Sequence, residues 1–305
     1  MLTKSDIESK LLNNDALFNN IHIIQQNFDI IPNKDTHIGA NIAYQDIQEL
    51  RKEFLNELYD TIVDWIYDSE KYQELLKKEI QNGKSCAAAS SAIQRKAKEK
   101  FRGNSKCDKL LIQGQIGELL LFHFIQRFMK AIPLIRKMKI TTSPNMERFG
   151  ADAIHYRKDD DKNVFVLGEA KVYTSDYQFD SAFENSLDSI LNTYYNLSQE
   201  LKLYVHEDFL SPELDEIAER YLNNTIDNPY LELVCIVMYN ENKKIDVLSD
   251  VSIYSQIEKI IKDRFKNFDN SKIDIGAHPI LSRINYIVFP VWKLEELATE
   301  FQNKI

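Results

Sequence analysis

Four charged residues in the middle of the sequence have the types and spacing that chemistry requires. Glu118 lies in the segment GQIGELLLF, and Asp152 lies in FGADAIHY. Glu169 and Lys171 lie in VFVLGEAKVY, where the alternation of a strand places both on one face. A carboxylate and an ammonium side by side at the end of an apolar strand cost desolvation energy unless the protein uses them.

Metal-assisted phosphodiester hydrolysis is the chemistry that uses such a set. Mg²⁺, or Mn²⁺ in its place, takes oxygen ligands and keeps several waters, so two or three carboxylates suffice to hold it. We predict that Asp152 and Glu169 bind the metal and that Glu118 completes the acidic ring from a helix. Lys171 is then expected to orient the attacking water and to offset negative charge. The competing interpretation is an ordinary surface ion pair at a strand end.

Two nearby features are interpreted as structural. The run Asp159-Asp160-Asp161 falls in a polar turn between two predicted strands, which favours a solvated loop. His155 comes three residues after Asp152, so a strand would place the two side chains on opposite faces. The sequence contains neither a GxSxG elbow nor a GxxxxGK[ST] loop, so neither a serine hydrolase nor a P-loop ATPase is indicated.

The apolar pattern that must position these residues changes along the chain. Residues 1–40 show no regular pattern, and apolar positions three and four apart then predict helices. The predicted helices cover 43–78, 85–100, 108–130, 180–204, 212–223, 251–268 and 294–301. The predicted strands cover 137–142, 151–156, 163–172, 231–239 and 284–292. This order predicts an α/β fold with a mixed sheet after a helical N-terminal third.

The charge of the chain is unevenly distributed. The 305 residues carry a formal charge of −9, which taken alone counts against a nucleic-acid-binding protein. Residues 77–148, however, contain sixteen basic and five acidic side chains, a charge of +11 that leaves −20 for the rest. A basic segment in an acidic frame suits a local polyanion site, because phosphate contacts are short-ranged. A solvated helix face explains the same pattern equally well.

The composition is that of an ordinary soluble protein, which we expect in the cytoplasm. Hydrophobic residues make up 44% and charged residues 28% of the chain, and its three cysteines form no CxxC pair. These proportions exclude disordered proteins, disulfide frameworks and zinc ribbons. The chain contains no apolar run long enough to span a membrane, and its first residues contain no apolar signal segment.

The motifs resemble those of a known nuclease superfamily. The order of one helix and three strands, with Glu118, Asp152 and then the Glu169–Lys171 pair, resembles the PD-(D/E)xK nucleases, with GADAIH and GEAK as core motifs. KLLIQGQIGELLLF, FGADAIHY and VLGEAKVY are similar to the HamA family of nuclease subunits of Hachiman anti-phage defence systems, and to the related AbpA subunits. Ala151 stands where the superfamily's name has a proline.

This resemblance implies a restriction-endonuclease-like fold, divalent-metal DNA cleavage, a helicase partner of the HamB type and a site at those four residues. We expect residues 1–104 to form a mainly helical region that binds the partner or DNA, and residues 105–305 to form the nuclease domain. The expected function is cleavage of DNA with little sequence preference, restrained by the helicase. The alternatives are an inactive nuclease-fold adaptor that binds DNA or the helicase, and an RNase.

Overall fold

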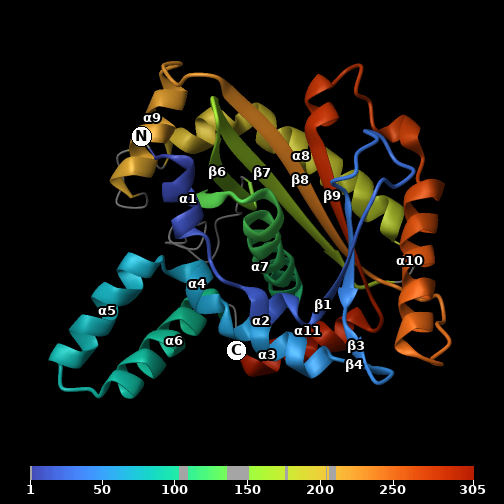
Figure 1. Cartoon of the computed structure of the whole chain (residues 1–305), viewed down its shortest axis with the longest axis horizontal. Helices are drawn as coiled ribbons and strands as arrows, with labels where there is room; N and C mark the ends of the chain where they lie inside the picture. The colour runs from blue at the N-terminus through green and yellow to red at the C-terminus, as the bar shows by residue number, and fades with distance from the viewer. Residues whose placement is uncertain (1, 103–108, 136–150, 176–177, 204, 206–210) are drawn as a thin grey trace.

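A seven-stranded mixed sheet forms the centre of the molecule (Figure 1). The computed structural model describes residues 2–102, 109–135, 151–175, 178–203, 205 and 211–305. The strands follow the order β1 (Ile21–Gln25), β2 (Ile38–Ile42), β9 (Ile284–Val291), β8 (Pro229–Asn240), β7 (Lys162–Tyr173), β6 (Ala153–Asp159) and β5 (Ile132–Ile135). β2, β9, β8 and β7 pair in parallel, and the pairs β1–β2, β6–β7 and β5–β6 are antiparallel. The expected α/β fold with a mixed sheet is confirmed.

Helices flank this sheet on both sides. Those in the first half of the chain are α1 (Lys4–Lys10), α2 (Asp15–Phe18), α3 (Arg51–Asp60), α4 (Ile62–Ile66), α5 (Ser69–Gln81), α6 (Cys86–Arg102) and α7 (Lys109–Met129). Those in the second half are α8 (Phe179–Lys202), α9 (Pro212–Leu222), α10 (Asp250–Asn267) and α11 (Leu294–Lys304), with short 3₁₀ turns η2 (Asn270–Lys272) and η3 (Pro279–Arg283). A separate hairpin joins β3 (Tyr44–Gln45) to β4 (Gln48–Glu49).

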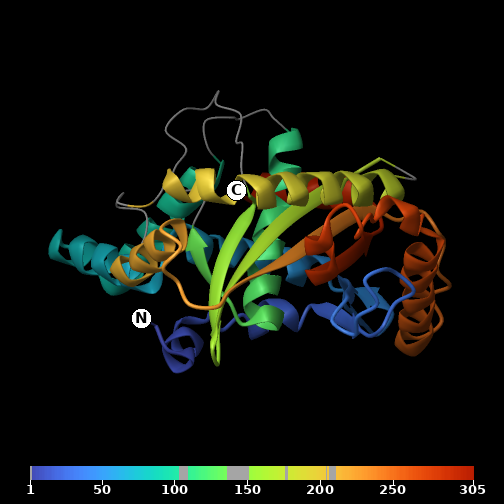
Figure 2. The same cartoon turned by 90° about the horizontal axis from the view of Figure 1, so that it is seen from above.

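The alternation of the central strands divides the hydrophobic core into two layers. In β8, Val234 and Ile236 pack in one layer with residues of α3, α7 and α11. Leu233 and Val237 pack in the other layer with residues of α8, α9 and α10. Apolar side chains on both faces explain why β8 and β9 are continuous apolar runs in the sequence. The α5–α6 hairpin and α10 lie at opposite ends of the molecule (Figure 2).

The long helix predicted over residues 43–78 is instead broken into α3, α4 and α5. The first break follows Asp60, where Thr61 ends α3 and donates its hydroxyl proton to the carbonyl of Leu58. The second break comes at Asp68, whose carboxylate accepts the N–H of Lys71 at 2.7 Å and so caps α5. Ser, Thr and Asp side chains that bond to nearby backbone groups end helices although the apolar spacing continues across them.

The N-terminal region contributes strands that the sequence pattern did not predict. β1 and β2 lie within the first 42 residues, and β2 pairs in parallel with β9 through Ile38 and Ile287. Every residue of β2 is buried, so the strand carries no polar–apolar alternation to reveal it. Residues on both sides of position 104 therefore share one sheet, and the region expected to be mainly helical supplies two of its strands.

The strand expected at residues 137–142 lies outside the described residues. The structure has β5 just before it, with Pro133 opposite His155 of β6. β5 is the outermost strand of the sheet, where a proline is tolerated. No helix in the described part of the chain is both long and apolar enough to cross a membrane.

Candidate active site

The candidate site lies where β7 extends beyond its neighbour β6. β6 begins at Ala153, which pairs with Gly168, whereas β7 continues to Tyr173 with β8 as its parallel neighbour. Past Gly168, the backbone N–H of Ala170 donates to Oδ2 of Asp152 at 2.9 Å. The Asp152 carboxylate thus accepts the hydrogen bond of a β7 backbone N–H just beyond the end of the β6–β7 pairing. This bond holds the carboxylate against β7.

Glu169 and Lys171 project together from this extended part of β7. The Lys171 ammonium donates to Oε1 of Glu169 at 2.8 Å. The Glu169 side chain is 7% exposed and that of Lys171 is 25% exposed, so the pair lies at the boundary between core and solvent. These two hydrogen bonds bring Asp152, Glu169 and Lys171 together around three consecutive residues of β7, as the spacing of the three residues predicts.

The electrostatic balance of the pair keeps Lys171 charged. Burial alone would lower the pKa of Lys171, but the charge and hydrogen bond of Glu169, with the charge of Asp152, raise it above the ordinary lysine value. On β8, Cys235 stands in register with Glu169. Burial, followed by the charge of Glu169, raises the pKa of the Cys235 thiol, so a neutral thiol faces the site rather than a thiolate ligand.

Glu200 is a residue of this region that the sequence analysis missed. The backbone N–H of Ala151, directly before Asp152, donates to both carboxylate oxygens of Glu200 at 3.0 Å. Glu200 is buried near the end of α8, on the same face as Leu197 and Leu201. A glutamate within an apolar helical stripe was the available signal, because a buried carboxylate needs a hydrogen-bonding partner.

Glu118 approaches β7 from the other face of the sheet. Its neighbour Gly117 lies so close to β7 that a Cβ at that position would stand 2.6 Å from Cγ2 of Val172 and 3.3 Å from Cβ of Ala170. Glu169 points to the opposite face because strand residues alternate. Across the described ranges of the chain, no three His, Cys, Asp or Glu side chains gather closely enough to hold a metal ion. The place of Glu118 as third member of the acidic ring therefore stays a prediction.

Asp152 and Glu169 form a pair of carboxylates that fits a magnesium ion. Mg²⁺ is commonly held by one or two carboxylates, with waters and substrate phosphates as the other ligands. Asp152 and Glu169 supply hard oxygen atoms from adjacent strand ends, and the neighbouring thiol of Cys235 is protonated. A set of this kind favours Mg²⁺ or Mn²⁺ over a thiolate-binding metal such as zinc.

The two features interpreted as structural occupy structural positions. His155 is buried, and its Nδ1 lies 3.0 Å from the carbonyl oxygen of Ala131. Asp160 and Asp161 are exposed in the β6–β7 turn, where Asp160 has a positive φ of 40°. Asp159 pairs with Arg157 at 2.8 Å. The hairpin turn therefore belongs to the solvated surface.

Comparison with known proteins gives one result that covers almost the whole chain. The family model described as HamA matches residues 15–305, which include α7, the β6–β7 hairpin and α8. A comparison with curated proteins finds no match. The match extends well beyond the motif segments, across both layers of the core. The chain therefore belongs to the HamA family, and is a component of a Hachiman defence system.

Proposed function

We propose that this chain is the metal-dependent deoxyribonuclease of its defence system, an effector that cuts DNA with little sequence preference. The observation that carries the proposal is the joining of Asp152 to Ala170 and of Lys171 to Glu169 within one short stretch of β7. A binding module would need neither a carboxylate pair nor a half-buried lysine at a strand end, where desolvation makes them costly. Membership of the HamA family supports the same assignment.

Each residue has a distinct role in the proposed hydrolysis. Asp152 and Glu169 would hold Mg²⁺, which when bound polarises a phosphoryl oxygen and makes a water more acidic. The Lys171 ammonium, kept charged beside Glu169, donates hydrogen bonds and offsets the negative charge that develops at the phosphate. Water is thereby added across one P–O bond, giving a phosphate monoester and a hydroxyl. Glu118, on α7, is proposed as the third acidic residue of the site.

The proposal includes restraint by a helicase subunit. A nuclease that attacks DNA of any sequence endangers its own cell, so its activity must depend on a partner. The −20 charge outside residues 77–148 supports this idea, because it leaves a large acidic surface that does not suit DNA. ATP consumption is assigned to the partner, because the chain has no P-loop motif.

A plasmid-cleavage assay tests the proposed activity. With Mg²⁺, the wild-type chain should cut supercoiled DNA, and EDTA should abolish the cutting. Asp152→Asn, Glu169→Gln and Lys171→Met should each reduce the rate by about a hundredfold or more, as expected when a transition-state contact or metal ligand is lost. Asp160→Asn is the matched control for Asp152→Asn, because it makes the same change in the exposed hairpin turn.

The outcomes of this assay separate the alternatives. Cutting that survives all three substitutions would overturn the assigned site. DNA binding without cutting in Mg²⁺ or Mn²⁺ would identify an adaptor, and cutting of RNA but not DNA would identify a ribonuclease. Adding the helicase subunit should slow the cutting of intact plasmid, and an equal rate with and without it would refute the proposed restraint.

A further inference from the structure

The solvent-exposed side of α6 carries several side chains that can donate hydrogen bonds. Ser91, Gln94, Arg95 and Lys98 follow the spacing that places helical residues on one side. The opposite face is apolar and buried, with exposed fractions between 0 and 3%, at Ala89, Ala92, Ile93, Ala97 and Phe101. The helix is thus divided into a buried half and a half that presents donors to solvent.

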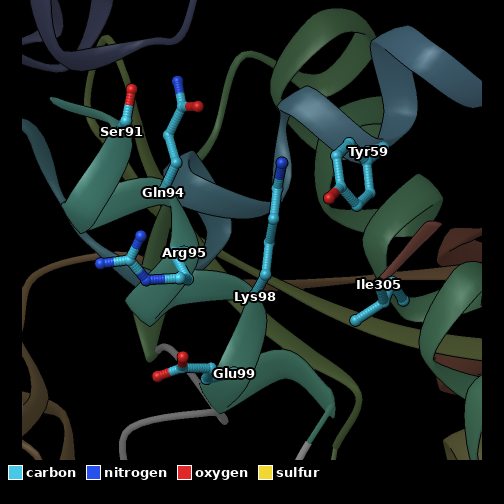
Figure 3. Close-up of a pocket in the computed structure, with 7 residues that line it drawn as sticks. All are labelled: Tyr59, Ser91, Gln94, Arg95, Lys98, Glu99 and Ile305. Carbon is cyan, nitrogen blue, oxygen red and sulfur yellow. The ribbon is translucent and has the colours of Figure 1, made fainter. Parts of the chain in front are cut away.

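These donors line a pocket of about 370 Å³ between α6, α3 and the end of α11 (Figure 3). Tyr59 of α3 and Ile305 complete its wall. Lys98 projects beside Tyr59, Gln94 points the same way as Lys98, and the carboxylate of Glu99 points away from the Lys98 ammonium (Figure 3). The pocket is open to solvent, so an extended ligand can cross it.

The basic residues of this part of the chain divide into two groups. Lys84 and Lys96 both pair with Glu79 at 2.5 Å, and these two hydrogen bonds lower the pKa of Glu79 to about 2. Part of the basic segment is therefore structural, because it holds the α5–α6 turn together. Arg95, in contrast, pairs with no acid among the residues that the structure describes, and it remains available to a ligand.

Lys98 is held in position by an aromatic ring. Its ammonium lies 3.3 Å from the centre of the Tyr59 ring, a cation–π contact between α6 and α3. This contact restricts a side chain that would otherwise sample many rotamers. The entropy cost of ordering Lys98 is then already met before a ligand binds.

We infer that this pocket binds the phosphate backbone of a DNA strand, outside the metal site. The inference rests on the proposed nuclease function and names where the protein holds its substrate strand. Four donors spread over eight residues of helix cover about 10 Å, which suits a strand rather than a single small anion. Arg95, Lys98 and Glu99 sum to +1, which matches a singly charged phosphodiester better than a polyphosphate. Contacts with the backbone alone explain binding without sequence preference.

A binding assay that does not depend on cleavage tests this inference. The full-length chain is titrated, in EDTA, with a fluorescent 30-nucleotide oligo(dT), and anisotropy is recorded between 50 and 200 mM NaCl. Arg95→Ala with Lys98→Ala should weaken binding about tenfold at the lowest salt. It should also reduce the slope of log K against log salt by about 1.4, the value for two lost contacts with a single strand. Alanine suits a helix, and both residues lie on its solvent side, so thermal melting should show a folded variant.

The matched control removes the same two charges at the same spacing from another helix. Lys259→Ala with Lys262→Ala on α10, both exposed, should leave both affinity and salt slope unchanged. Tyr59→Phe keeps the ring under Lys98 and should also bind normally, whereas Tyr59→Leu should weaken binding. Equal losses in the α6 and α10 double variants would reduce the effect to net charge and overturn the inference.

Two further outcomes separate this site from the proposed activity. If the α6 double variant binds DNA like the wild type while the metal-site variants lose cleavage, the pocket assignment is wrong and the nuclease stands. If binding depends on Arg95 and Lys98 but no cleavage occurs, the pocket stands and the nuclease fails. An oligo(rU) that binds more tightly than oligo(dT) at the same salt would overturn the assignment of a DNA strand.

Discussion

At the scale of single residues, the site depends on two backbone N–H groups held by carboxylates. Asp152 takes the N–H of Ala170, and Glu200 takes the N–H of Ala151 with both oxygens. Ala151 immediately precedes Asp152. The bonds to Glu200 therefore fix the backbone just before Asp152, and the bond from Ala170 fixes the Asp152 side chain. Glu200 is therefore a positioning residue, because it acts on the site through the backbone of Asp152.

Replacing Glu200 should impair the metal site more than the fold. Glu200→Ala removes both acceptors and should raise the Mg²⁺ concentration for half-maximal plasmid cleavage by about ten- to a hundredfold, as the loss of a supporting contact typically does. Glu200→Gln keeps one carbonyl acceptor for the N–H of Ala151 and should recover most of the affinity. Asp188→Ala, an exposed acid on the same helix, is the control. An unaltered Mg²⁺ dependence in Glu200→Ala would show that Glu200 does not position the metal site.

The sequence predicts part of this neighbourhood because a short hairpin sets it. Asp152 directly precedes β6, Glu169 and Lys171 lie on β7, and a tight turn joins the two strands, so local register brings the three residues together. The bond between Ala151 and Glu200 joins residues 49 positions apart, across the packing of α8 on the sheet. No local pattern encodes such a contact, so the sequence did not predict a role for Glu200. The placement of Glu118 on the other face similarly follows from how α7 packs.

At the scale of elements, the close approach of α7 to β7 depends on one of two nearby glycines. A Cβ on Gly117 would lie 2.6 Å from the branched side chain of Val172, whereas one on Gly114 would meet nothing within 4 Å. The β-branched Val172 has little rotamer freedom with which to yield. The two glycines therefore offer a matched pair of positions on one helix.

Alanine should have opposite effects at these two positions. Gly117→Ala forces α7 away from β7 and should lower the free energy of unfolding by about 1–3 kcal/mol, the usual cost of overpacking. Gly114→Ala gains helix propensity in open space and should be neutral or stabilising by up to about 1 kcal/mol. Urea unfolding monitored by circular dichroism measures both. Equal destabilisation by the two substitutions would contradict the packing argument.

Elements with long apolar patterns were predictable, and those defined by local polar bonds were not. The helices near 180–204 and 251–268 and the strands near 231–239 and 284–292 are present at nearly the expected bounds. The break at Asp68 depends on a side-chain cap, which the apolar spacing of residues 43–78 hides. β1 and β2 are only five residues long, and their partner β9 lies at the other end of the chain.

At the scale of the whole molecule, a buried histidine joins the N-terminal segment to the last strand. The Nε2 of His37 lies 2.7 Å from the carbonyl oxygen of Pro32, and its Nδ1 lies 3.2 Å from the backbone nitrogen of Tyr286. The first contact requires a proton on Nε2, and the second requires Nδ1 to accept. Both bonds are satisfied by one neutral tautomer. Burial accordingly lowers the pKa of His37 to about 4.

Stability should therefore fall as the solution becomes acidic. Between about pH 6.5 and pH 4, His37 is protonated in the unfolded chain but neutral in the folded chain, so lowering the pH favours unfolding. The loss from this group should reach about 2 kcal/mol at pH 5. In urea unfolding, His37→Gln should be less stable than the wild type at pH 7, with a gap that narrows at pH 5. A gap of constant size would show that His37 does not titrate in this way.

The parallel pairing of β2 with β9 also sets an order of events during synthesis. β9 lies between β2, made among the first residues, and β8, which borders the strand that carries Glu169. The sheet can close only after residue 291 has left the ribosome, on the order of tens of seconds after residue 42 at ordinary rates of elongation. In a nascent chain, β1 and β2 therefore cannot join the sheet until β9 has been made. For a protein with the proposed activity, the complete sheet exists only after residue 291 has been made.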